Sequence, residues 1–151
     1  MNKALLKSRR DDWETPRGLF NELNREFGFT LDPCATHITA KCPKYYTPLE
    51  DGLLQDWADE VVFCNPPYNH KQNEWVRKCY LHGLKGGTAV MLLPARTDTA
   101  RFHDFILGKS EIRFLRGRLK FGKATGNAPF PSMIVVFSKE QTRRSRFTVG
   151  V

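Results

Sequence analysis

The strongest constraint on the fold comes from two continuous apolar segments, residues 61–64 and 88–93, each followed by a turn that contains proline. Strands that are apolar on both faces are typical of a parallel sheet covered by helices on both sides. Between the two segments, apolar residues recur at helical spacing over 75–84 and stop before a Gly-Gly pair. This strand–helix–strand order predicts an α/β fold with a mostly parallel central sheet.

The rest of the chain continues the alternation. Thr15 is a good N-cap and Pro16 suits the first position of a helix, so we predict a helix that begins there and ends at Gly28. The other predicted elements are a short strand over 29–31, an irregular stretch over 33–60, a short helix through 102–106, and strands over 112–115, 119–121 and 133–137, the last of the chain. Because no helix separates the closing strands, we expect an antiparallel hairpin at one edge of the sheet.

The net charge of +8 is unevenly distributed along the 151 residues. Residues 11–75 hold twelve acidic and five basic side chains, whereas residues 76–138 hold eleven basic and three acidic ones. We predict a single domain over 11–138, with a basic leader over 1–10 and a basic tail over 139–151, and no separate target-recognition domain. The basic half favours a polyanionic partner, nucleic acid first, although basic tails can also serve solubility alone.

Composition and cysteine spacing exclude several classes. No apolar segment approaches the roughly 20 residues of a membrane span. The leader lacks the apolar core of a signal peptide, so we expect a protein that is neither membrane-bound nor exported. Cys34, His37 and Cys42 lie within nine residues, but no fourth ligand has a suitable spacing, so we predict no metal site. We expect free thiols in a reducing cytoplasm.

Polar turns follow three of the predicted strands. They are residues 32–35, 65–68 and 94–96. In open α/β sheets, ligands bind beyond the carboxyl ends of the strands. We therefore expect the three turns to lie side by side and to form the functional site.

The turn Asn65-Pro66-Pro67-Tyr68 carries the most specific chemistry. Prolines have no N–H, so their carbonyl groups can act as acceptors outside the sheet, and the Asn65 side chain adds another acceptor. Two convergent acceptors suit an –NH₂ group, and Tyr68 offers a flat face on which a planar ring can stack. No strong base or nucleophile is present. The turn therefore favours direct attack by a positioned amine on an activated methyl group.

Seven ordered segments give this turn a wider context. They are residues 12–16, 31–35, 51–53 with Trp57, 65–68, 94–99, 117–121 and 128–132. In this order they resemble the bacteriophage and prophage DNA N-6-adenine methyltransferases, which use S-adenosylmethionine and share an Asn/Asp-Pro-Pro-Tyr/Phe signature. The resemblance implies a Rossmann-like methyltransferase fold and methylation of an adenine amine in double-stranded DNA. It also implies a phage-encoded enzyme that acts in a bacterial host, where such methylation serves restriction-modification or regulation.

The resemblance also implies roles for individual residues. Asn65 and the Pro66 carbonyl would bind the adenine amine, with Pro67 completing the catalytic turn. Tyr68 would stack on the flipped base, with Phe130 as the second aromatic wall and Phe121 as its rival. The residues implied to bind the cofactor are Trp13, Thr15, Pro16, Asp32, Pro33, Cys34, Ala35, Asp51 and Asn65.

The chain departs from the family pattern in two respects. No glycine-rich turn follows the first strand, and no acidic residue ends a second strand, where it would bind the cofactor ribose. Tyr45, Tyr46 or a backbone group could take that role. Because only 18 residues separate Asp32 from Asp51, we expect an abbreviated form of the methyltransferase sheet.

The basic half supplies candidates for DNA phosphate contacts. Arg96, Arg118, Lys120 and Lys123 are the leading ones, and Arg113 is another. The alternation over 118–121 predicts that Arg118 and Lys120 share one strand face. Two other functions stay open: methylation of another planar amine (cytosine, an RNA base or a glutamine amide), or a catalytically silent nucleic-acid-binding module. The oligomeric state, monomer or homodimer, is also open.

Overall fold

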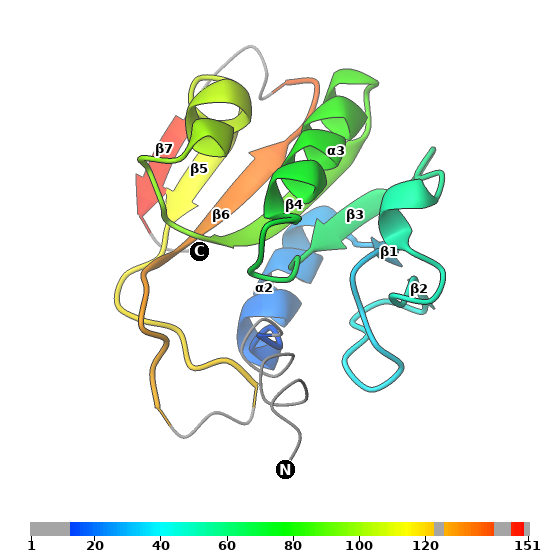
Figure 1. Ribbon diagram of the computed structural model, residues 1–151, viewed down its shortest axis with the longest axis horizontal. Helices are drawn as coiled ribbons and strands as arrows, with labels where there is room; N and C mark the ends of the chain where they lie inside the picture. The colour runs from blue at the N-terminus through cyan, green and yellow to red at the C-terminus, as the bar shows by residue number, and fades with distance from the viewer. Residues whose placement is uncertain (1–12, 123–125, 141–145, 150–151) are drawn as a thin grey trace.

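A computed structural model describes residues 13–122, 126–140 and 146–149 (Figure 1). Lys123 and the leader therefore lie outside the described residues. The elements are α2 (Arg17–Phe27), β1 (Leu31–Asp32), β2 (Lys44–Tyr45), the 3₁₀-helix η1 (Gly52–Leu54), β3 (Val61–Cys64), α3 (Gln72–Leu84), β4 (Thr88–Pro94), the π-helix η2 (Phe102–Ile106), β5 (Glu111–Phe114), β6 (Ser132–Phe137) and β7 (Arg146–Val149).

In the described part of the chain, one sheet of seven strands has the order β2-β1-β3-β4-β6-β5-β7. The neighbouring strands β2, β1, β3 and β4 are parallel to one another, so the predicted α/β fold with a mostly parallel central sheet is confirmed. β6 is antiparallel to both β4 and β5, and β7 returns parallel to β5. The sheet thus consists of a Rossmann-like parallel part, from β2 to β4, which is extended by the antiparallel β5–β6 hairpin and by β7.

The antiparallel β5–β6 hairpin forms on the far side of β4 from the parallel strands, as expected, and two other expectations about the closing strands need correction. The strand that ends at Phe137 is not the last, because β7 follows it and forms the edge. Residues 119–121 are not a strand; a single backbone bond from Ala128 N to Leu119 O (2.8 Å) ties this segment to the next loop. Arg118 and Lys120 therefore share no strand face.

The sheet separates two apolar layers. Val62 and Cys64 of β3 face the layer that contains α3, whereas Phe63 faces the layer that contains α2. Figure 1 shows α3 and η2 in front of the sheet and α2 behind it. Because β3 and β4 are buried on both faces, their sequences are apolar without alternation, as the pattern predicts.

The start of α2 differs from the prediction, while its end agrees with it. Pro16 is the N-cap residue, no side chain caps the helix, and Thr15 is instead buried against Asn65. Gly28 ends the helix in the left-handed conformation (φ 66°), with its N–H bonded to Asn24 O. Between β1 and β2 the described chain forms turns rather than a helix, which confirms the expected abbreviation.

Candidate active site

The carboxyl ends of β1, β3 and β4 lie next to one another, because these three strands are parallel neighbours. The turns over 32–35, 65–68 and 94–96 follow these ends, so the structure brings them to one edge of the sheet, as the sequence predicts. Trp13 and Thr15, which precede α2, also reach this edge, where they contact Asn65 in the turn after β3.

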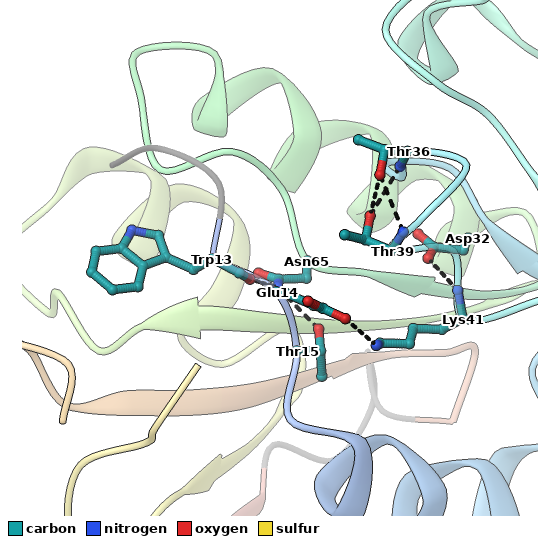
Figure 2. A network of polar contacts seen from close by, with 8 residues as sticks. All are labelled: Trp13, Glu14, Thr15, Asp32, Thr36, Thr39, Lys41 and Asn65. Atoms are coloured by element: carbon teal, nitrogen blue, oxygen red, sulfur yellow. Dashed lines mark hydrogen bonds and ion pairs between the residues drawn. The ribbon is translucent and has the colours of Figure 1, made fainter. Parts of the chain in front are cut away.

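The Asn65 side chain has a fixed orientation. Its Nδ2 donates to the Trp13 carbonyl and to Thr15 Oγ1, the latter at 2.9 Å (Figure 2). Its Oδ1 is buried and has no hydrogen-bond partner among the described residues. Since both amide protons are used, the amide cannot turn over without losing two bonds. Asn65 therefore presents a desolvated, unused acceptor, which is a costly arrangement unless a ligand donates to it.

A polar network holds residues 13–15 over the ends of the strands (Figure 2). Lys41 Nζ forms an ion pair with Glu14 at 3.1 Å, and the Lys41 ammonium group is almost fully buried. The backbone N–H of Lys41 donates to the Asp32 carboxylate at 3.0 Å. Because Asp32 is buried, its pKa is raised to about 6 despite this bond and a longer one from Cys34 N. Opposite charges thus surround a small polar space beside Asn65, bounded also by Thr15 and Thr39.

A cavity of about 370 Å³ lies beside this network. Its volume is within the usual range for small-molecule sites. It is lined by Pro33, Cys34, Ala35, Thr36, Thr47, Pro48, Asp51, Gly52, Leu53, Pro67, Asn69, Lys71 and Trp75. Four of the predicted cofactor residues, the segment 33–35 and Asp51, thus line one cavity, and Cys34 also borders the polar space beside Asn65. Neither Tyr45 nor Tyr46 lines it.

Asp51 and Gly52 shape one wall of this cavity. Asp51 has a positive φ of 55°, and its carboxylate accepts from Leu53 N at 3.1 Å, which starts η1. A Cβ on Gly52 would lie 2.0 Å from the Pro33 carbonyl oxygen. Glycine is therefore required here for the close approach of η1 to the turn after β1.

The predicted stacking residues gather in a second cavity of about 290 Å³. The ring centroids of Tyr68 and Phe130 are 5.3 Å apart, and the two ring planes meet at 66°. The rings of Trp13 and Tyr68 are stacked, with their centroids 6.5 Å apart. Trp13 therefore lies with the aromatic residues and also borders the polar space beside Asn65, but it does not line the cavity that contains Asp51. Phe121 packs against Tyr68 from outside the cavity lining, whereas Phe130 belongs to the lining. The buried Tyr68 hydroxyl has no partner in the described structure, and burial raises the pKa of this phenol.

The basic residues have different surroundings. Arg96 lines the aromatic cavity, 5.9 Å from the Phe130 ring, and Arg101 lines it too while donating to Asn73 Oδ1 at 3.1 Å. Arg118 and Lys120 are exposed. Arg113, in contrast, is bound by Glu26 and Glu111, so this arginine is not free for a phosphate contact.

Three further residues at this edge were not singled out by sequence reasoning. Glu14 and Lys41 form the ion pair of the network, and Gln72 lines the aromatic cavity from the start of α3. Gln72 lies only four residues after Tyr68, so its position near the turn could have indicated that it belongs to the site. Glu14 and Lys41 are 27 residues apart, and no local sequence pattern indicates that they form a pair.

The described residues lack the characteristic features of two other classes of protein. Among the described residues, none of the helices is both long and apolar enough to cross a membrane. Within the same residues, no cluster of three or more His, Cys, Asp or Glu side chains could hold a metal ion. None of the four cysteines, all of which lie within the described residues, forms a disulfide.

The amino-acid sequence is similar to one protein-family model and to proteins of known or assigned activity. A family model described as DNA N-6-adenine-methyltransferase (Dam) matches residues 2–150. The DNA N-6-adenine-methyltransferase of Haemophilus phage HP1 (strain HP1c1) is 30% identical over 139 residues, which cover 87% of this chain and 80% of the relative. The putative methyltransferase YfdM of Escherichia coli (strain K12) is 39% identical over 70 residues, or 42% of this chain and 77% of that protein.

Proposed function

The chain belongs to the DNA N-6-adenine-methyltransferase (Dam) family, and we propose that it transfers a methyl group from S-adenosylmethionine to the exocyclic amine of an adenine flipped out of duplex DNA. The observation that carries this proposal is the buried Oδ1 of Asn65, which has no partner among the described residues and belongs to the turn whose Tyr68 lines the aromatic cavity. An amine donor is the chemical complement of that acceptor.

The residues at the edge of the sheet fit the proposed cofactor. The cavity of about 370 Å³ with Asp51 on its wall would take the nucleoside end. The polar space bounded by Asp32, Lys41 and Thr15 offers both an anionic and a cationic group to the zwitterionic methionine end, but its volume is about 20 Å³, so it would have to widen on binding. When bound, S-adenosylmethionine supplies a methyl group on a positively charged sulfur.

Asn65 and Pro66 would position the adenine amine. Asn65 Oδ1 and the Pro66 carbonyl would accept its two protons and turn the nitrogen lone pair toward the methyl group. The Pro67 carbonyl already accepts from Asn69 N at 3.0 Å, which supports Pro66 as the acceptor of this pair. In this transfer the amine nitrogen would form a bond to the methyl carbon as the carbon–sulfur bond of the donor breaks, and one amine proton would leave to solvent. Catalysis would come from positioning rather than from a base.

Base extrusion accounts for the second cavity. An amine inside a duplex is inaccessible, so the adenine must leave the stack. Tyr68 and Phe130 would hold the flipped ring, and Trp13, whose ring stacks on that of Tyr68, would border it. Arg96 and Arg101 border this cavity and would contact the phosphates of the flipped nucleotide; Arg118, Lys120 and Lys123 remain proposed contacts further along the strand.

The decisive experiment is methylation of duplex DNA with labelled S-adenosylmethionine, followed by digestion to nucleosides. We expect label in N6-methyladenine. Label in methylcytosine would replace adenine with cytosine as the substrate. Parallel reactions with RNA or with protein in place of DNA test an RNA base or a glutamine amide as the substrate. Failure to bind the cofactor in calorimetry would instead indicate a catalytically silent nucleic-acid-binding module. We further propose that the enzyme acts on DNA in the cytoplasm of a bacterial host, in keeping with its relative from a phage.

A further inference from the structure

Gln72 has a buried polar group without a partner. It is the first residue of α3, and only 2% of its surface is exposed. Its Nε2 has no hydrogen-bond partner among the described residues, although its backbone N–H donates to Asn69 O at 3.1 Å. A buried amide group without a hydrogen-bond partner is destabilising, so such a group calls for an explanation.

The surroundings of this amide point to a ligand. Gln72 lines the aromatic cavity together with Trp13, Tyr68 and Phe130. The Tyr68 hydroxyl is also buried and has no partner within the described residues. The cavity therefore contains aromatic rings for a planar ligand and two buried donors.

The chemistry of adenine matches these donors. Under the proposed function, on which this inference rests, the exocyclic amine is bound by Asn65 and Pro66. The ring nitrogens of adenine are then left as acceptors only, and a dry cavity must supply donors to them. Glutamine is a usual partner of adenine, because its amide can donate to a ring nitrogen.

We propose that Gln72 is a base-recognition residue, which donates from Nε2 to a ring nitrogen of the flipped adenine. The contact fixes the rotation of the ring in its own plane and thereby places the amine against Asn65. A base that carries a proton on the corresponding nitrogen would face donor against donor and would be rejected.

The test combines Gln72→Met, which keeps length and volume but removes the donor, with DNA duplexes that carry 1-deaza-, 3-deaza- or 7-deazaadenine at the target. Each analogue lacks one ring nitrogen of adenine. In wild-type protein, we expect the analogue that lacks the nitrogen bound by Gln72 to lower kcat/KM about tenfold. Gln72→Met should lower kcat/KM for adenine by a similar factor, and that one analogue should carry no further penalty in the variant. A merely structural role of Gln72 would not produce this analogue-specific loss of additivity.

Several outcomes would overturn the assignment. Full kcat/KM in Gln72→Met contradicts it, and so does an unchanged penalty for every analogue in the variant. Wild-type protein that forms no N6-methyladenine contradicts the proposed function and the Gln72 role with it, whereas additive penalties in an active enzyme contradict the Gln72 role alone.

A second variant guards against misfolding of the first. Affinity for S-adenosylmethionine, measured by calorimetry, reports whether Gln72→Met is folded. If it is not, Gln72→Glu keeps the shape of the side chain, and its carboxylate accepts but cannot donate. Its activity relative to wild type should rise as the pH falls and the carboxyl group takes up a proton. A ratio that stays constant with pH contradicts the proposal.

Discussion

The hydroxyl oxygen of Thr15 accepts a hydrogen bond from Asn65 Nδ2 at 2.9 Å, across 50 residues of sequence. This bond joins the segment before α2 to the turn after β3. It uses one of the two amide protons of Asn65, and the Trp13 carbonyl takes the other. Thr15 therefore acts on the proposed reaction through Asn65 and is a positioning residue.

Thr15→Val should lower kcat without unfolding the protein. Valine has the same shape as threonine but cannot accept a hydrogen bond, so the Asn65 amide is held by one bond instead of two. A net contribution of about 0.5–1.5 kcal/mol corresponds to a roughly two- to tenfold loss, measured in single-turnover methylation. Thr15→Ser restores the hydroxyl and should restore the rate. A valine variant with wild-type kcat would show that the bond does not orient Asn65.

Asn65→Ala should abolish most turnover and leave cofactor affinity largely unchanged. The substitution removes the acceptor that faces the amine and does not alter the cavity lined by Asp51. Loss of one preorganised polar group at a reacting centre typically costs about 100- to 1000-fold in kcat. Calorimetry with S-adenosylmethionine and steady-state methylation separate the two effects. Retained activity would show that another group binds the amine.

The Thr15–Asn65 bond also illustrates the limit of prediction from sequence. A threonine before Pro16 has the local pattern of an N-cap, and the sequence predicts that role. In the structure the hydroxyl bonds to a residue of another element, which no local pattern can indicate. Asn65 itself could be predicted because its position directly after a buried strand fixes where it lies.

The same contrast holds for the strands. β3 and β4 are continuous apolar runs, and such runs are sufficient to predict buried strands. β2 consists only of Lys44 and Tyr45 and has no apolar pattern of its own; it exists because β1 pairs with it. Conversely, residues 119–121 alternate like a strand, but they do not pair with one in the described structure.

Cofactor affinity should fall as the pH is lowered through about 6. Burial raises the pKa of Asp32 from 3.8 to about 6, so the carboxyl group becomes neutral in the free protein below that pH. A neutral group no longer attracts the ammonium group of the cofactor. Titration calorimetry between pH 5 and pH 8 measures the effect. Asp32→Asn cannot ionise, so its weaker affinity should vary little over this range; an equal decline in both proteins would exclude Asp32 as the cause.

Asp32 should also make the free protein more stable at acidic pH. Because its folded pKa is raised, the folded state binds more protons than the unfolded state between about pH 4 and pH 6. The contribution of Asp32 to the free energy of unfolding thus falls as the pH rises through this window and is constant above it. Urea unfolding of wild type and Asp32→Asn measures it as the difference between the two. A difference that does not change with pH would contradict the raised pKa.

Gly52→Ala should destabilise the fold and weaken cofactor binding. The new Cβ would lie 2.0 Å from Pro33 O, so η1 must move away from the turn that lines the cofactor cavity. Such overpacking typically costs about 1–3 kcal/mol. Gly18→Ala is the matched control: Gly18 lies in α2 with no atom near the added Cβ, and alanine there should stabilise by about 0.5–1 kcal/mol. Equal melting temperatures for both variants would contradict the clash.

Arg96→Ala should weaken DNA binding and reduce its dependence on salt. Arg96 borders the aromatic cavity and forms no ion pair among the described residues, so it is available to a phosphate. Loss of one phosphate contact lowers the slope of log K against log salt by about 0.9. Arg25→Ala, which removes the same charge from an exposed position in the last turn of α2, should leave the slope unchanged. Fluorescence anisotropy on labelled duplex at several salt concentrations measures both slopes. Because general charge attraction would affect the two variants alike, equal slopes would show that Arg96 makes no specific phosphate contact.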